Sequence, residues 1–131
     1  MKAVDTNILA RYIRDDHPFQ SKKANHLIQR AVRQNEPLYS NHVVLCELVW
    51  ILTSVYDHRK DEVVNMLEAI LLTGHFQFED KGAIEFALED YKNTQSEFAD
   101  CLIGRRNQAL GCKSTLSFDR RLKALDSFEV L

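Results

Sequence analysis

The chain has 131 residues, of which 45% are hydrophobic and 27% are charged, and its formal net charge is −2. These values are ordinary for a globular protein, and the length predicts one domain over residues 1–131. The acidic net charge argues against a general nucleic-acid-binding protein, because such domains are usually basic. The longest apolar run, residues 43–52, is too short to cross a bilayer, and the N-terminus has no basic and apolar leader. We therefore expect a cytoplasmic protein without a membrane partner.

The predicted elements alternate between short strands and longer helices. Strand character is found at residues 2–4, 38–40, 76–78 and 112–118, and residues 128–130 fit an edge strand. Apolar residues recur with helical spacing over residues 24–32, 63–71 and 84–91. Alternating strands and helices favour right-handed crossovers and a parallel sheet covered on both faces. The predicted fold class is α/β, a three-layer α/β/α sandwich with a short parallel sheet of four or five strands.

The first candidate for chemistry is Asp5, which ends the first predicted strand. Thr6 and Asn7 follow it at once, and a helical apolar pattern then begins. Open parallel sheets bind their ligands outside the carboxyl ends of the strands, which is where this carboxylate would lie. The alternative is that Asp5 only caps the following helix. Taken alone, Asp5 does not distinguish the two roles.

The second candidate, Glu47, is the only charged residue in the apolar segment 43–52. A helix this apolar is expected to be largely buried. A buried carboxylate must be paired, protonated or bound to a metal ion. We therefore expect Glu47 to face the core, either as a metal ligand or in an ion pair with an arginine.

Two further acids occupy similar settings. Asp100 follows a predicted capping box, Thr94-x-x-Glu97, so it should lie in the first turns of a helix and point into a packed region. Asp119 follows the predicted strand 112–118 and precedes a basic turn, where a helix cap is as good an explanation as catalysis. Ser117, two residues earlier, could orient a metal-bound water or satisfy the end of the strand.

If these four acids converge, their chemistry is that of a metal site. Oxygen ligands without His or Cys select a hard cation such as Mg²⁺ or Mn²⁺, which would serve phosphodiester hydrolysis. Paired arginines could then bind the phosphates of a nucleic acid, although solvated helix faces are their default explanation. These phosphate candidates are Arg11, Arg14, Arg105, Arg106, Arg120 and Arg121.

Four segments in order along the chain resemble the successive motifs of PIN domains. They are Val-Asp-Thr-Asn-Ile-Leu at residues 4–9, Ser40 with Glu-Leu-Val-Trp at 47–50, Phe-Ala-Asp-Cys-Leu-Ile at 98–103, and Ser-Phe-Asp-x-x-Leu at 117–122. Within PIN domains, the chain looks like the single-domain VapC-type toxins of type II toxin–antitoxin pairs.

The resemblance implies a Mg²⁺- or Mn²⁺-dependent endoribonuclease that forms a homodimer and is inhibited by a small antitoxin protein. It implies that Asp5, Glu47 and Asp100 bind the metal ion and that Asp119 completes the catalytic site, sometimes through water. It also implies that hydrogen bonds support these acids from Thr6, Asn7, Ser40 and Ser117.

Three other functions remain open. A Mg²⁺-dependent phosphoryl-transfer domain would also hold acids at a sheet edge, but Asp5 has no second acid two positions on. A non-catalytic RNA- or protein-binding domain of the same fold is disfavoured by the complete set of acids. A DNA nuclease of similar architecture is poorly separated from a ribonuclease by sequence.

Overall fold

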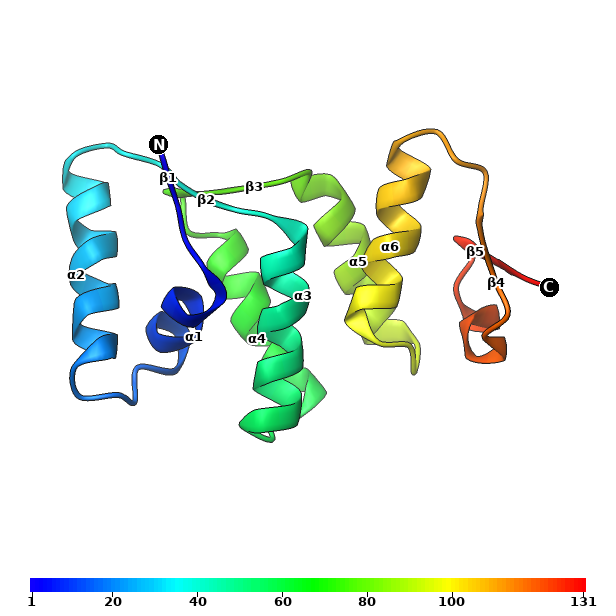
Figure 1. Ribbon diagram of the computed structural model, residues 1–131, viewed down its shortest axis with the longest axis horizontal. Helices are drawn as coiled ribbons and strands as arrows, with labels where there is room; N and C mark the ends of the chain where they lie inside the picture. Colours follow the sequence, from blue (N-terminus) through cyan, green and yellow to red (C-terminus); the bar gives the residue numbers. More distant parts are fainter. The chain divides into compact units, whose positions relative to one another are not determined.

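The computed structural model describes residues 1–131, which divide into two compact units, Met1–Glu79 and Asp80–Leu131 (Figure 1). The first unit contains three strands and four helices, and the second contains two helices and two strands. No helix in the structure is both long and apolar enough to cross a membrane.

The first unit is built around a three-stranded parallel sheet. Its strands are β1 (Lys2–Ala3), β2 (Leu38–Ser40) and β3 (Phe76–Phe78), in the order β1-β2-β3. The connections are helical: α1 (Thr6–Arg14) and α2 (Gln20–Arg33) join β1 to β2, and α3 (His42–Trp50) and α4 (Lys60–Leu71) join β2 to β3. A π-helical turn, Ile51–Val55, extends α3. Because all three strands are parallel, their carboxyl ends lie at one edge of the sheet.

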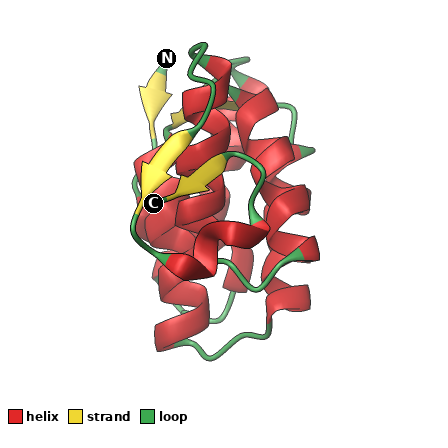
Figure 2. Cartoon of the chain, turned by 90° about the vertical axis from the view of Figure 1, so that its right-hand side faces the viewer, coloured by secondary structure: helices red, strands yellow, loops and turns green.

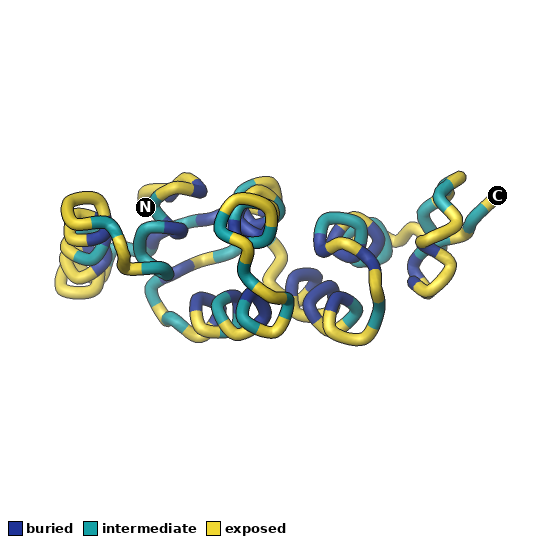
Figure 3. Tube along the Cα trace, turned by 90° about the horizontal axis from the view of Figure 1, so that it is seen from below, coloured by how far each residue is buried: buried dark blue, intermediate teal, exposed yellow.

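Helices cover both faces of this sheet. In Figure 3, α1 and α3 lie on one side of the strands and α4 lies on the other. Both α1 and α3 start at a side-chain cap: Asp5 accepts from the Thr6 N–H, and Asn41 accepts from the Val44 N–H. The apolar faces supply a closely packed core that includes Leu9, Ile28, Leu38, Leu45, Leu48, Val63, Leu67 and Ile70.

The second unit joins a helix pair to a two-stranded parallel sheet. Helices α5 (Lys81–Asn93) and α6 (Phe98–Ala109) pack together, with Tyr91 and Phe98 in edge-to-face contact at 5.8 Å between ring centroids. Strands β4 (Thr115–Ser117) and β5 (Phe128–Val130) pair in parallel and are joined by a 3₁₀ turn, Arg120–Ala124 (Figure 2).

Gly104 is the point of closest packing between α6 and the segment that leads into β5. A Cβ at this position would lie 2.1 Å from Ser127 Oγ and 2.9 Å from the Phe128 ring. Glycine is therefore required here by the space available, since no larger side chain can fit without displacing the buried Ser127 side chain and the half-buried Phe128 ring.

The α/β class is confirmed, and a strand forms at each of the five predicted places. All strand pairings are parallel, as expected. The structure differs from the expectation of one sheet, because the strands form one three-stranded and one two-stranded sheet. The strands are also shorter than the sequence suggested at 112–118, where only three residues pair.

Candidate active site

Asp5 lies two residues beyond the end of β1 and caps α1. Its Oδ1 accepts a hydrogen bond from the Thr6 N–H at 2.7 Å, so the capping role is confirmed. The residue is exposed, and its second carboxylate oxygen has no hydrogen-bond donor within the protein. One carboxylate oxygen of Asp5 thus caps the helix, and the other is available to bind a ligand.

Glu79, an acid that the sequence analysis did not select, also lies at the carboxyl edge of the first sheet. Glu79 directly follows β3, and its Oε1 accepts from the His42 N–H at 3.0 Å, which satisfies the start of α3. The same oxygen lies 3.8 Å from His42 Nδ1. The signal in the sequence was its position immediately after the strand 76–78, as for Asp5 after the first strand.

The expectation that Glu47 faces the core is wrong. The residue is exposed, and its helix α3 turns the face with Val43, Glu47 and Trp50 outward. Val43 is 73% exposed and Trp50 is 61% exposed, so this helix has an apolar outer face as well as an apolar inner one. An apolar sequence therefore did not distinguish the buried face from the exposed face.

Two of the four expected supporting residues have buried hydroxyl groups without a partner. Thr6 Oγ1 and Ser40 Oγ are both buried and make no hydrogen bond. Buried polar atoms are normally satisfied, so such orphans call for a ligand or an ordered water. Both residues adjoin the carboxyl edge of the sheet: Ser40 ends β2, and Thr6 starts the helix that follows β1. Asn7, the third, is exposed.

In the second unit, Asp100 lies in the first turn of α6 and is partly buried, as expected. Burial raises the pKa of its carboxyl group above the ordinary value, and the charges of Glu97 and Asp119 raise it further, whereas Arg121 opposes the shift. The predicted capping box is wrong: the Thr94 hydroxyl donates to the Asp90 carbonyl, and Glu97 occupies the cap position without a side-chain cap bond.

Asp119 follows β4 and caps the 3₁₀ turn. Its Oδ1 accepts from the Arg121 N–H at 3.0 Å, and its N–H donates to Ser117 Oγ at 3.0 Å. The Arg121 guanidinium grips both carboxylate oxygens, with Nε to Oδ1 at 3.0 Å and Nη2 to Oδ2 at 2.8 Å. This guanidinium holds the pKa of Asp119 below its ordinary value. Ser117, the fourth supporting residue, therefore orients the backbone of Asp119.

The donor chemistry fits a hard divalent cation. The candidate ligands are carboxylates, which such an ion prefers. Burial and the charges of neighbouring carboxylates raise the pKa of Asp100. The buried hydroxyls of Thr6 and Ser40, which have no hydrogen-bond partner, lie beside the edge of the sheet. The first unit carries Asp5 and Glu47, and the second carries Asp100 and Asp119. In neither unit alone do three Asp, Glu, His or Cys side chains come together in a group that could hold a metal ion.

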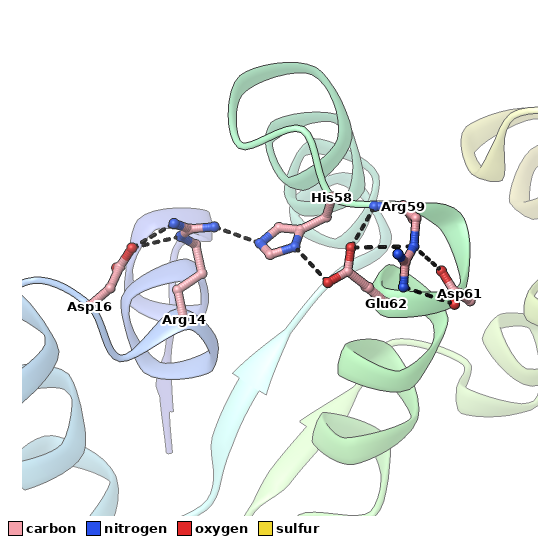
Figure 4. A network of polar contacts seen from close by, with 6 residues as sticks. All are labelled: Arg14, Asp16, His58, Arg59, Asp61 and Glu62. Atoms are coloured by element: carbon pink, nitrogen blue, oxygen red, sulfur yellow. Dashed lines mark hydrogen bonds and ion pairs between the residues drawn. The ribbon is translucent and has the colours of Figure 1, made fainter.

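Arg14, Arg105 and Arg121, all phosphate candidates, are engaged by acids of the chain itself. Arg14 pairs with Asp16 at 2.5 Å and contacts His58 Nε2 (Figure 4). Its guanidinium also stacks on the Tyr56 ring. Arg105 makes a bidentate pair with Asp90, at 2.7 and 2.9 Å, which links α6 to α5. The third is Arg121, held by Asp119. These partners reduce the charge that the three arginines could offer to a phosphate.

The remaining three arginines differ from one another. Arg11 donates from Nε to the neutral Gln20 side chain at 2.7 Å. Arg120 is exposed at the start of the 3₁₀ turn, and Arg106 is half-buried in α6.

The chain is similar to a protein family and to a known protein. A family model described as PIN domain matches residues 2–127. A relative named VapC ribonuclease, from Aquifex aeolicus (strain VF5), is 28% identical over 125 residues, which cover 95% of this chain and 92% of that protein.

Proposed function

Because the chain belongs to the PIN-domain family, we propose that it is an endoribonuclease that depends on Mg²⁺ or Mn²⁺ and acts as the toxin of a toxin–antitoxin pair. The observation that carries this proposal is the likeness to a protein named VapC ribonuclease over nearly the whole of both chains. The setting of Asp5, two residues beyond the end of a parallel strand and with one carboxylate oxygen that accepts no hydrogen bond, supports it.

The proposed catalytic and metal-binding residues are Asp5, Glu47, Asp100 and Asp119, contributed by one domain over residues 1–131. A divalent cation held by these carboxylates would activate water and stabilise charge on the scissile phosphate. Thr6 and Ser40 support the site through hydroxyls that have no other partner, and Ser117 fixes the backbone of Asp119. Asn7 is the exposed second residue of α1, where its amide can reach a ligand.

The proposed partners are an RNA substrate in the cytoplasm, a cognate antitoxin and a second copy of the chain. The antitoxin and the homodimer rest on the resemblance of the four motifs to VapC-type toxins. The apolar segment Val63 to Leu72 could also serve as a dimer face, but Val63, Val64, Leu67, Ile70 and Leu71 are buried within their own unit, and Leu72 is exposed.

The deciding experiment is cleavage of purified cellular RNA and DNA with Mg²⁺, Mn²⁺ or EDTA. We expect RNA to be cut only with a divalent cation. Asp5→Asn and Asp100→Asn should each lower the cleavage rate by at least about 100-fold, because each removes one metal ligand. Asp57→Asn is the matched control, because Asp57 is exposed, and its left-handed backbone, φ 56°, is one that Asn tolerates. RNA left intact under every metal condition would exclude the nuclease, and cutting of DNA alone would favour the DNA nuclease.

Metal binding has a second readout that does not depend on catalysis. A ligand that binds only the folded state stabilises it by about 2.7 kcal/mol at 100 times its Kd. We therefore expect Mg²⁺ or Mn²⁺ to raise the Tm of the wild type and of Asp57→Asn, but not of Asp5→Asn or Asp100→Asn. Equal shifts in all four proteins, measured by differential scanning fluorimetry, would count against a carboxylate metal site.

A further inference from the structure

A small hollow of about 340 Å³ lies between α1 and α2. It is lined by the polar or basic residues Asn7, Arg11, Gln20 and Lys23 and by the apolar residues Ile8, Ala24 and Leu27. Its volume is at the small end of the range for ligand pockets. All of these residues belong to the first unit, and Asn7 follows Asp5 by only two residues.

The two cations of this hollow are not neutralised by the protein. Arg11 donates its Nε–H to the neutral Gln20 side chain, and its terminal nitrogens make no ion pair with a carboxylate. Lys23 is exposed and has no acid within ion-pair distance. The hydrogen bond from Arg14 and, more weakly, the charge of Arg11 lower the pKa of Asp16, but the carboxylate of Asp16 forms its ion pair with Arg14. Arg11 and Lys23 therefore differ from Arg14, Arg105 and Arg121, whose charges are met internally.

The start of α2 adds positive potential at the hollow. Gln20 and Lys23 lie at the first turn of α2, which is the positive end of that helix dipole, whereas Arg11 reaches the hollow from the last turn of α1. The first turn of α2 has no acidic residue, and Phe19 at its N-cap makes no side-chain cap hydrogen bond. His17 Nδ1 accepts from the Phe19 and Gln20 N–H groups, so the acceptor at the start of α2 is not a carboxylate.

We propose that this hollow is a phosphate subsite for the RNA backbone, next to the phosphate that is cut. Arg11 and Lys23 bind the phosphate oxygens, and the Arg11–Gln20 hydrogen bond fixes the plane of the guanidinium. Ile8, Ala24 and Leu27 form the apolar side against which a ribose can pack. The short chain distance to Asp5 makes the subsite specific for a nucleotide adjoining the cleavage site. The proposal rests on the proposed ribonuclease function.

The test measures binding without cleavage. A fluorescein-labelled, mixed-sequence single-stranded RNA of twelve nucleotides is titrated with full-length Asp100→Asn protein in EDTA, at several KCl concentrations. Arg11→Gln and Lys23→Gln are added singly to that background. The matched control is Lys22→Gln, because Lys22 is an exposed neighbour on α2 that does not line the hollow.

Each variant of the subsite should weaken RNA binding roughly five-fold at 0.1 M salt and lower the slope of log K against log[salt] by about 0.7, which is one phosphate contact on a single strand. Arg11→Lys should retain most of the slope, because it keeps the charge. Arg11→Gln and Lys23→Gln binding as tightly as Lys22→Gln would overturn the proposal. So would weaker binding with an unchanged salt slope, because the substitution would then have removed no phosphate contact.

The outcomes separate this proposal from the nuclease. If the wild type cuts no RNA with any metal but Arg11→Gln and Lys23→Gln still lower the affinity and the slope, the anion subsite stands and the nuclease fails. If the wild type cuts RNA and the two variants bind like the control, the nuclease stands and the subsite fails. A Tm for each variant identifies any that does not fold, and Arg11→Met or Lys23→Met then replaces it, because either also removes the charge.

Discussion

At the scale of single residues, the candidate acids differ in how the protein treats their charge. Asp5 shares one oxygen with a helix start, and Asp119 is held by a guanidinium. Asp100 is partly buried, and the charges of Glu97 and Asp119, which have its own sign, lie near it. A carboxylate in that setting destabilises the metal-free fold, and such a perturbed carboxylate is typical of a functional site.

Asp100→Asn therefore has a predictable pH dependence. The pKa of Asp100 is raised in the folded state, so from pH 3.8 upward the folded protein holds a proton that the unfolded chain has already lost. Wild-type stability then falls as the pH rises through the interval between 3.8 and the raised folded pKa, and the loss persists at neutral pH. Below pH 3.8 the group is protonated in both states and contributes nothing.

Asp100→Asn does not lose stability in this way, because its amide does not titrate. Relative to the wild type, Asp100→Asn should become more stable between pH 3.5 and pH 7, and at pH 7 it should be at least as stable as the wild type. Urea unfolding in EDTA at a series of pH values measures the difference. A variant that is markedly less stable than the wild type at pH 7 would show that Asp100 serves structure through a pairing interaction instead.

At the scale of elements, α6 is positioned by two short-range constraints. Arg105 ties it to α5 through Asp90, and Gly104 lets it approach Ser127 at a distance that no side chain permits. Asp100 lies one turn before Gly104 on this helix, so the position of the helix determines the position of the candidate acid within its unit.

Gly104→Ala should destabilise the protein by about 1–3 kcal/mol, because the added methyl group overpacks against Ser127 and Phe128. The loss occurs although Ala is the better helix former by about 1 kcal/mol. Gly82→Ala is the control: its methyl group would meet only Asp80 Oδ1 at 3.7 Å, so stability should stay equal or rise. Adding Ser127→Gly should restore part of the loss, and urea denaturation measures all three effects.

Sequence patterns anticipated the elements better than their environments. The strands at 2–4, 38–40, 76–78 and 128–130 and the caps at Asp5 and Asp119 depend on local preferences, which a sequence carries directly. The exposure of Glu47 depends on which face of an apolar helix meets the sheet, and this is decided by tertiary packing. Likewise Arg105 and Asp90, fifteen residues apart, pair only because α5 and α6 pack together. The family motifs selected four acids, but their convergence stays a prediction.

At the scale of the whole molecule, residues 1–131 divide into two compact units that each carry two of the four acids. If the chain is one domain, as its length predicts, the two units should unfold in a single cooperative transition. Amide signals from Met1–Glu79 and from Asp80–Leu131, followed separately by NMR through a urea titration, should then give the same midpoint. Two midpoints would establish two domains, each with its own stability.

The outward face of α3 gives the protein a built-in optical probe. Trp50 is the single tryptophan of the chain, it is 61% exposed, and it follows Glu47 by three residues, which places the indole and the carboxylate on the same side of the helix. A paramagnetic Mn²⁺ ion bound by Glu47 would quench the indole emission, whereas Mg²⁺ at the same place would not. A protein that covers this face would shift the emission to shorter wavelength. Occupancy of the candidate site and docking of a partner can thus be followed in the unlabelled natural sequence.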